Sequence, residues 1–99
     1  MDPKEKIINY LKSNKKRLQK EYHLTKIGIF GSMALNSYSD KSDIDLLVEF
    51  ENNVADLYLL KMKIREEIEK KFNRPVDICR EKYIRPIFKD QIISETIYV

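Results

Sequence analysis

The segment KIGIFGSMALNSYSDKSDIDLLVEF, residues 26–50, has the pattern of two strands joined by a turn. Its first part, Lys26–Phe30, is rich in β-branched and aromatic residues, as strands are, and it stops at Gly31-Ser32. A short helix over Met33–Leu35 can follow, and residues 36–42 have a turn-like composition. Asp43–Phe50 then alternates, which predicts a second strand. Its predicted apolar face consists of Ile44, Leu46, Val48 and Phe50.

Helices are predicted on both sides of this segment. An opening helix has Asp2 as its N-cap and Pro3 at its first position, and its apolar residues recur at helical spacing as far as Leu18. A second long helix covers residues 54–72, where apolar residues repeat at intervals of three and four. Asn53, just before this helix, is its predicted N-cap.

A third strand and a last helix complete the predicted elements. Residues 76–79 form the strand, with Asp77 between apolar residues, and residues 86–95 form the helix. We expect the apolar side chains of this helix and of the tail, residues 97–99, to pack into the core rather than to bind a partner. The order α-β-α-β-α-β-α predicts an α/β (α+β) fold, in which a small mixed β-sheet is flanked by helices.

Composition restricts the class of protein. The 99 residues fit one domain, 1–99, because they leave no room for a second core. Lys and Arg number 19 against 16 Asp and Glu, a net charge of +3 that is too small and too dispersed to predict direct nucleic-acid binding. No apolar run approaches the roughly 20 residues of a membrane span, and the N-terminus has no apolar signal-peptide region. We therefore expect a cytoplasmic protein without a membrane partner.

The counts of cysteine and histidine exclude several kinds of site. Cys79 is the only cysteine, so the chain has no internal disulfide and no cysteine-built zinc site. His23 is the only histidine, and a surface or helix-end role is the ordinary one for such a residue. If the chain catalyses a reaction, carboxylates must therefore provide the catalytic groups.

Three aspartates occupy apolar strand segments, where aspartate is disfavoured. Asp43 and Asp45 are two residues apart, so their backbones lie about 7 Å apart on one face of a strand. Two such carboxylates repel each other unless a cation such as Mg²⁺ neutralises them. Asp77, on a neighbouring strand, is the candidate third ligand of a two-metal site. A structural role for Asp77, as an ion-pair partner of Arg74 or Lys82, remains the alternative.

Gly31-Ser32 is a candidate phosphate-binding turn. A glycine between a strand and a helix lets a phosphate approach the backbone, and the hydroxyl of Ser32 adds a donor. A polyphosphate there would present its reacting phosphorus to metal ions held by Asp43 and Asp45, which is the geometry of nucleotidyl transfer. Gly-Ser alone is a common turn, and Asp-x-Asp alone need not bind anything. Their separation by ten residues is what favours the chemical interpretation.

The pattern Gly31-Ser32-x10-Asp43-Ile44-Asp45, with VDI at residues 76–78, resembles the minimal nucleotidyltransferases of the DNA polymerase β superfamily. The resemblance covers nearly the whole chain and implies the nucleotidyltransferase fold. The small size resembles the stand-alone antitoxin-type members, which are found beside HEPN ribonuclease toxins. Active members transfer AMP from ATP to a tyrosine hydroxyl of the toxin and thereby silence it.

The resemblance also implies a role for each residue of the pattern. Gly31 and Ser32 would hold the triphosphate of ATP, the substrate. Asp43 and Asp45 would bind two Mg²⁺ ions. Asp77 would help to bind the metal on the acceptor side and would deprotonate the incoming hydroxyl as general base. The implied partner is a HEPN-type toxin.

The chain departs from the family pattern at two positions. Many members have GSRARG at this turn, whereas Met33 and Leu35 replace the two arginines here. Because arginine stabilises phosphate charge with two hydrogen bonds, their absence affects the expected rate, ATP affinity or acceptor choice. A second hypothesis is therefore an antitoxin that neutralises its toxin by binding alone. A third, a transferase for a small hydroxylated molecule, is disfavoured because so short a chain has little material for a dedicated pocket.

Overall fold

The computed structural model describes residues 2–99, and Met1, the first residue of the predicted domain, lies outside them. The helices are α1 (Pro3–Ser13), α2 (Lys15–Tyr22), α3 (Gly31–Ala34), α4 (Leu57–Phe72) and α5 (Pro86–Glu95), with a 3₁₀ turn, η1 (Glu81–Tyr83). The strands are β1 (Leu24–Phe30), β2 (Ile44–Phe50), β3 (Val76–Arg80) and β4 (Ile97–Tyr98).

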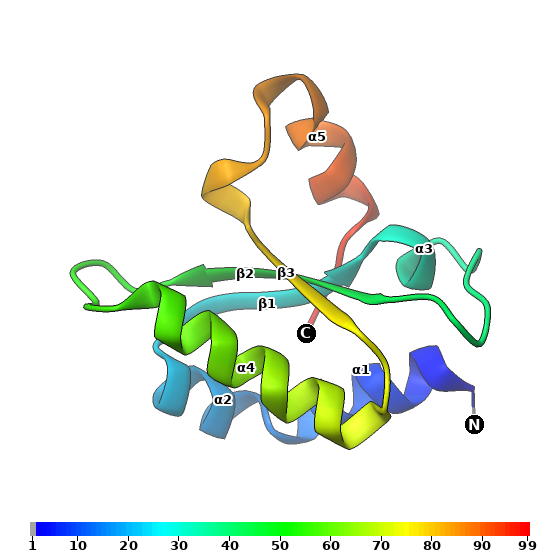
Figure 1. Cartoon of the computed structure of the whole chain (residues 1–99). Coiled ribbons are helices and arrows are strands. Elements are labelled where there is room, and N and C mark those ends of the chain that lie inside the picture. Colours follow the sequence, from blue (N-terminus) through cyan, green and yellow to red (C-terminus); the bar gives the residue numbers. More distant parts are fainter. Residues whose placement is uncertain (1) are drawn as a thin grey trace.

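The four strands form one mixed sheet in the order β3-β2-β1-β4. β1 is antiparallel to β2 and to β4, whereas β2 and β3 are parallel. Parallel neighbours require a crossover connection, and α4 provides it (Figure 1). The predicted small mixed sheet flanked by helices is confirmed, and with it the α/β (α+β) fold class.

α1, α2 and α4 cover one face of the sheet (Figure 1). The predicted apolar face of β2 is buried in this layer, since Ile44, Leu46 and Val48 are fully buried and Phe50 nearly so. Side chains from the three helices complete the core, among them Ile7, Leu11, Leu18, Ile64 and Ile68. Alternation along a strand turns the residues between them, such as Asp45, to the opposite face. The core therefore fixes the sheet from one side, while the other side carries Asp45 together with the buried Leu47.

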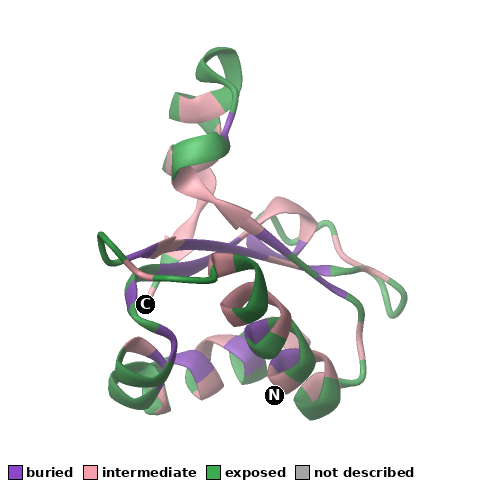
Figure 2. Ribbon diagram, turned by 60° about the vertical axis from the view of Figure 1, so that its left-hand side comes forward, coloured by how far each residue is buried: buried purple, intermediate pink, exposed green. Residues whose placement is uncertain are grey.

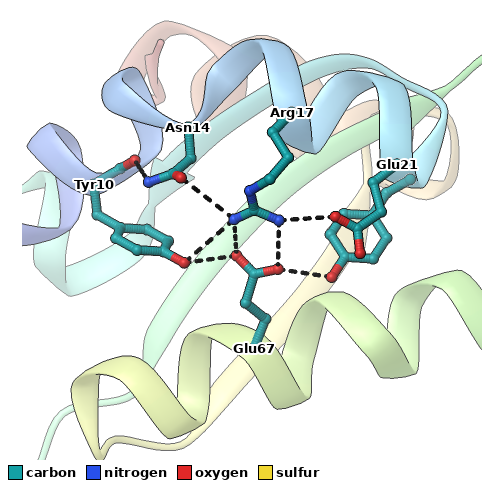
Figure 3. A network of polar contacts seen from close by, with 6 residues as sticks. Tyr10, Asn14, Arg17, Glu21 and Glu67 are labelled. Atoms are coloured by element: carbon teal, nitrogen blue, oxygen red, sulfur yellow. Dashed lines mark hydrogen bonds and ion pairs between the residues drawn. The ribbon is translucent and has the colours of Figure 1, made fainter.

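A network of polar contacts joins the covering helices, with Glu67 of α4 at its centre (Figure 3). Glu67 Oε2 accepts hydrogen bonds of 2.7 Å from Tyr10 Oη and Arg17 Nη2. Glu67 Oε1 accepts a hydrogen bond of 2.7 Å from Tyr22 Oη. Glu21 forms a further ion pair with Arg17, at 2.8 Å. Because Tyr10 lies on α1 and both Arg17 and Tyr22 lie on α2, one carboxylate ties three helices together.

The opening helix differs from the prediction, because the chain breaks it in two at Asn14. The backbone N–H and the side-chain amide of Asn14 both donate to the carbonyl of Tyr10, at 3.0 and 2.9 Å. An amide side chain that binds its own backbone in this way competes with the continuing helix. The apolar spacing predicted the helical segments but carried no signal for this break.

The start of α4 also differs from the prediction. The helix begins at Leu57 rather than Val54, and its N-cap is Asp56, whose carboxylate accepts a hydrogen bond of 3.1 Å from the N–H of Leu59. Asn53 lies in the preceding turn with a φ of 62°. Both residue types suit turns and caps, so composition alone did not separate the two roles.

The C-terminal part corrects the expected core packing of the last helix, whereas Ile97 and Val99 of the tail pack against the core as expected. α5 has the predicted limits, but none of its residues is buried, and Ile87 is 83% exposed. The helix stands away from the layers on the side of the sheet opposite α1, α2 and α4 (Figure 2). The tail forms β4, which pairs with β1 through Gly28 and Ile29. Within residues 2–99, no helix has the length and apolar character needed to cross a membrane.

Candidate active site

The three predicted aspartates lie near the beginning of two parallel strands. Asp45 of β2 and Asp77 of β3 are directly opposite each other in the strand pairing, and Asp43 immediately precedes β2. Their neighbours Ile44 and Val76 are buried on the helical side, so Asp45 and Asp77 face the other side of the sheet. Asp45 is half-buried, whereas Asp43 and Asp77 are exposed. The structure therefore brings the three acids into one region.

Gly31 brings the predicted phosphate-binding turn to the same region. It directly follows Phe30, the residue of β1 that pairs with Asp45. Its φ of +71° belongs to the left-handed region that favours glycine. A Cβ added to Gly31 would collide with Oδ2 of Asp45 and lie 3.1 Å from its Cγ. Glycine is thus required here both by the backbone and by the carboxylate that packs against it.

Ser32 lies next to this contact, in the single helical turn α3. The turn is closed by the hydrogen bond from Leu35 N–H to the Gly31 carbonyl, at 3.1 Å, and the Ser32 carbonyl accepts one from Ser37 N–H at 3.0 Å. Its hydroxyl forms no hydrogen bond with any other part of the described chain. The Ser32 hydroxyl is therefore available to a ligand.

The electrostatics of the three carboxylates are uncompensated. Burial raises the pKa of Asp45 above its usual value, and the negative charges of Asp77 and Asp43 raise it further. In the part of the chain that the structure describes, none of the three acids forms an ion pair. The alternative for Asp77 is thus not observed, because Arg74 donates to the carbonyls of Ser39 and Ser42 instead. Negative charge accumulates here without a protein cation to balance it.

The acids suit a hard cation in their chemistry, but they do not form a ready-made metal centre. No group of three or more His, Cys, Asp or Glu side chains among residues 2–99 is arranged to hold a metal ion. Three like charges repel each other, so a common ligand set needs the charge of the ion itself. Unpaired carboxylate oxygens are the ligands that Mg²⁺ prefers. Asp43, Asp45 and Asp77 thus fit a magnesium ion by donor type and charge.

The two positions without arginine differ in the structure. Met33 is fully buried and belongs to the main core, whereas Leu35 is 52% exposed. A cation at position 33 of this chain would therefore have to be buried. Position 35 faces solvent at the end of α3, where a longer charged side chain would fit without disturbing the core.

A groove of about 720 Å³ lies elsewhere, in the helical layer. It is formed by α1 and the C-terminal end of α4, and its lining includes the cations Lys6, Lys71 and Arg74 but no carboxylate. None of the five predicted site residues contributes to it. Because the groove offers no group able to accept a proton from a substrate hydroxyl, we assign the candidate active site to the carboxylates.

Comparison with known proteins agrees with the fold described above. Residues 5–99 match the family described as the nucleotidyltransferase domain. The chain belongs to this family. It is a nucleotidyltransferase, as the Gly-Ser and Asp-x-Asp pattern predicted, and the match includes every residue of that pattern.

Two curated relatives are similar to this nucleotidyltransferase over almost their full length. One, from Methanocaldococcus jannaschii, is named "Putative protein adenylyltransferase MJ1379" and is 34% identical over 94% of each chain. The other, from Thermococcus cleftensis, is named "Protein adenylyltransferase MntA" and is 27% identical over 96% of this chain and 94% of its own. The similarity of length means that the whole of this small domain is shared with them.

Two solved structures resemble the fold. The first is described as a "putative minimal nucleotidyltransferase", with a TM-score of 0.79, 27% identity, and coverage of 98% of this chain and 95% of the other. The second is a toxin-antitoxin crystal structure with AMP-PNP, with a TM-score of 0.66 and 16% identity over 87% of this chain and 69% of the other. At that identity the second likeness concerns the fold alone.

Proposed function

We propose that this nucleotidyltransferase uses ATP and Mg²⁺ to transfer AMP to a tyrosine hydroxyl of a HEPN-type toxin, and that it acts as the antitoxin of that toxin. The names of the curated relatives support protein adenylyl transfer, and the nucleotide analogue in a toxin-antitoxin structure of the same fold supports ATP and a toxin partner. The resemblance of the sequence pattern to antitoxin-type members supports the same assignment.

One observation carries the proposal: the Asp45 carboxylate packs against Gly31, with Asp77 opposite it on the next strand. A phosphate that approaches the backbone at Gly31 would therefore lie beside the carboxylate pair. The ten residues between the two parts of the pattern are what lets the chain return from Ser32 to this point. A structural role would not explain why three acids lie together without a cation.

The proposed roles follow from this arrangement. Gly31 and Ser32 hold the triphosphate, while Asp43, Asp45 and Asp77 are the residues that would hold magnesium. The ion, when bound, neutralises phosphate charge and lowers the barrier to displacement at phosphorus. Asp77, which is exposed, accepts the proton of the attacking tyrosine hydroxyl. The new bond joins the tyrosine oxygen to the α-phosphorus, the bond from that phosphorus to the bridging oxygen breaks, and pyrophosphate leaves.

The side of the sheet that carries the acids supports a protein as the acceptor. Tyr83 of η1 and both Ile87 and Phe88 of α5 are exposed. α5 rises on the same side of the sheet as Asp45 and Asp77 (Figure 1). Exposed apolar side chains that cluster in one region are typical of protein-binding surfaces. A protein that covers α5 would approach the carboxylates from that side.

The test is intact-mass analysis of the candidate toxin after incubation with this protein, ATP and Mg²⁺. We expect the toxin to gain the mass of one adenylyl group, and we expect Asp43→Ala and Asp45→Ala to abolish the gain. Asp40→Ala is the matched control, because Asp40 is an exposed acid of the same loop as Asp43 and forms no ion pair among residues 2–99. A mass gain that persists in Asp45→Ala would refute the assigned site.

Binding without catalysis is the second candidate function, favoured by the apolar residues Met33 and Leu35 and by the absence of a ready-made metal group in residues 2–99. It predicts no mass gain, a stable complex with the toxin, and full neutralisation by the double variant Asp43→Ala/Asp45→Ala. Transfer-based neutralisation predicts that the same double variant no longer protects cells from the toxin. The two hypotheses therefore differ in a single growth assay.

A further inference from the structure

The loop between α3 and β2, residues 35–43, leads directly to Asp43, and its course depends on contacts from outside the loop. At its centre Ser39 and Ser42 form a local turn, with hydrogen bonds from Ser39 N–H to Ser42 Oγ at 2.8 Å and from Ser42 N–H to the Ser39 carbonyl at 3.2 Å. These bonds shape the turn, but they do not attach it to the sheet. The first half of the loop is attached by Lys4 Nζ, which donates to Asn36 Oδ1 at 2.9 Å, and by Tyr38, which packs against the core. The part nearest Asp43 is attached by Arg74.

Arg74 binds the loop on both sides of the turn. Its Nη1 donates to the carbonyl of Ser39 at 2.9 Å and to the carbonyl of Ser42 at 3.0 Å. The second carbonyl belongs to the residue immediately before Asp43. Because the guanidinium is planar, its two N–H directions are fixed, so both carbonyls are held in one orientation.

A second tether acts on the other side of Asp43. The N–H of Ile44 donates to the carbonyl of Pro75 at 2.8 Å. Asp43 thus lies between two residues that are both bound by the consecutive pair Arg74-Pro75. The same pair leads into β3, where Asp77 faces Asp45. A single segment before β3 therefore sets the position of Asp43 relative to the other two acids.

We propose that Arg74 is a positioning residue, which holds Asp43 in place for the magnesium ion and acts through the backbone of Ser42. This inference rests on the proposed function, because it assigns Asp43 to the metal. Arg74 itself touches neither nucleotide nor metal in this role. The role also explains why an arginine so close in sequence to Asp77 does not pair with it.

The first experiment measures binding of Mn²⁺ in the presence of ATP by electron paramagnetic resonance, with Mn²⁺ as the probe for the magnesium site. We expect Arg74→Ala to weaken Mn²⁺ binding by about tenfold, the lower range for loss of a group that orients a metal ligand. Arg74→Lys should have an intermediate effect, because lysine keeps the charge but not the planar pair of donors. Arg65→Ala is the control, since Arg65 is an exposed arginine of α4.

A double-mutant cycle separates positioning from a general structural role. In the Asp43→Asn background, Arg74→Ala should cause no further loss of Mn²⁺ affinity, because the residue through which it acts has already been removed. Additive losses would overturn the proposal. Equal Mn²⁺ affinity of Arg74→Ala and the unchanged protein would overturn it as well. Arg74→Lys keeps the cycle usable if the alanine variant does not fold.

Limited proteolysis tests the tether independently of metal and activity. Lys41 is an exposed trypsin site within the loop. We expect cleavage after Lys41 to be faster in Arg74→Ala than in Arg65→Ala, as followed by mass spectrometry. If Arg74→Ala is cleaved faster but even the unchanged protein binds no Mn²⁺, the tether is supported and the proposed metal-dependent function is contradicted. Unchanged cleavage with unchanged Mn²⁺ affinity would reject the role of Arg74 and leave the proposed function standing.

Discussion

Glu67 and Asp45 are partly buried carboxylates on opposite sides of one sheet, and they differ in the charge of their neighbours. Burial acts to raise the pKa of both. At Glu67, hydrogen bonds from Arg17, Tyr22 and Tyr10 outweigh burial and lower the pKa from 4.5 to about 2 (Figure 3). At Asp45 no donor opposes burial, so its pKa rises. The fold neutralises one acid itself and leaves the other for a ligand.

Glu49 shows that the sheet face of Asp45 does not prevent neutralisation. It lies four residues further along β2 and therefore on the same face. Arg80 Nε donates to its Oε2 at 2.9 Å, and the backbone N–H of Lys82 donates to its Oε1 at 3.0 Å. Burial acts to raise the pKa of Glu49, but hydrogen bonds from the N–H of Phe50, from Arg80 and from the N–H of Lys82 lower it overall. The lack of partners is thus specific to the end of the sheet that carries Asp45, as expected for a functional site rather than a structural one.

The largest expected effect is on catalysis. Asp45→Asn should reduce the rate of the proposed adenylyl transfer by about 10²-fold or more, because in the proposed site it removes charge where transition-state charge would be stabilised. Glu49→Gln, on the same strand and face, should leave the rate within a few-fold of the unchanged protein. The measurement is the initial rate of toxin modification by intact mass. Similar losses in both variants would mean that the effect comes from the sheet and not from the site.

The next largest effect is on stability, and it concerns the other carboxylate. Glu67→Gln should lower the free energy of unfolding by about 2 kcal/mol, because it weakens a charged hydrogen bond to Arg17 and disturbs those of Tyr10 and Tyr22. Glu66→Gln is the matched control on the exposed side of α4. Urea denaturation measures both. Adenylyl transfer below the unfolding transition should be unaffected, and a loss of activity without a loss of stability would contradict the division of roles.

The sequence predicted those helices and strands in which a local pattern is repeated. It predicted less well the boundaries that depend on a single contact. Alternation in β2 predicted its buried face, and the spacing in α4 predicted that helix, because burial acts on many residues at once. The break at Asn14 coincides with a hydrogen bond from its side-chain amide to the carbonyl of Tyr10, which no periodicity reveals. The exposure of Ile87 was missed because apolar spacing does not distinguish a core face from a partner face.

The residues of the candidate site could be named from the sequence, but the contacts that hold them in place could not. The spacing of Gly31-Ser32 and Asp43-x-Asp45 predicted that the two parts share one site, and the direct approach of Asp45 to Gly31 is what the structure adds. The pairing of Asp45 with Asp77 depends on a parallel crossover, for which sequence gives no register. From the sequence, Arg74 was considered only as an ion-pair partner of Asp77, because a positive charge suggests an acidic partner. In the structure it donates to backbone carbonyls, and every residue has a carbonyl, so the sequence does not indicate which ones it binds.

The pH dependence of stability should have opposite signs for the two carboxylates. The folded state holds the proton of Glu67 less tightly than the unfolded state, so its contribution is present above pH 4.5 and is lost as the pH falls towards about 2. The folded state holds the proton of Asp45 more tightly, so its contribution is present at low pH and is lost as the pH rises through the raised pKa. Acid thus weakens one contribution and strengthens the other.

The measurement is urea denaturation at several pH values, in which each variant is compared with the unchanged protein. The destabilisation by Glu67→Gln should shrink towards low pH. Asp45→Asn should become more stable relative to the unchanged protein as the pH rises through the raised pKa of Asp45. Parallel curves for the two variants would show that Asp45 is neutralised by a protein group after all.

The smallest expected effect comes from adding a charge to the region that lacks one. Leu35→Arg should strengthen ATP binding about threefold to tenfold, because its exposed position lets a guanidinium reach bound phosphate without a change in the core. Leu59→Arg is the matched control, because Leu59 is 42% exposed on α4. The substitution adds the same charge on the side of the sheet that the helices cover. Isothermal titration with ATP and Mg²⁺ measures both. Equal gains would indicate a long-range effect of net charge. A gain confined to Leu35→Arg would mean that the exposed turn has room for a phosphate contact that this chain does not make. The same substitution at Met33 could not restore such a contact, because it would bury an unpaired charge in the core.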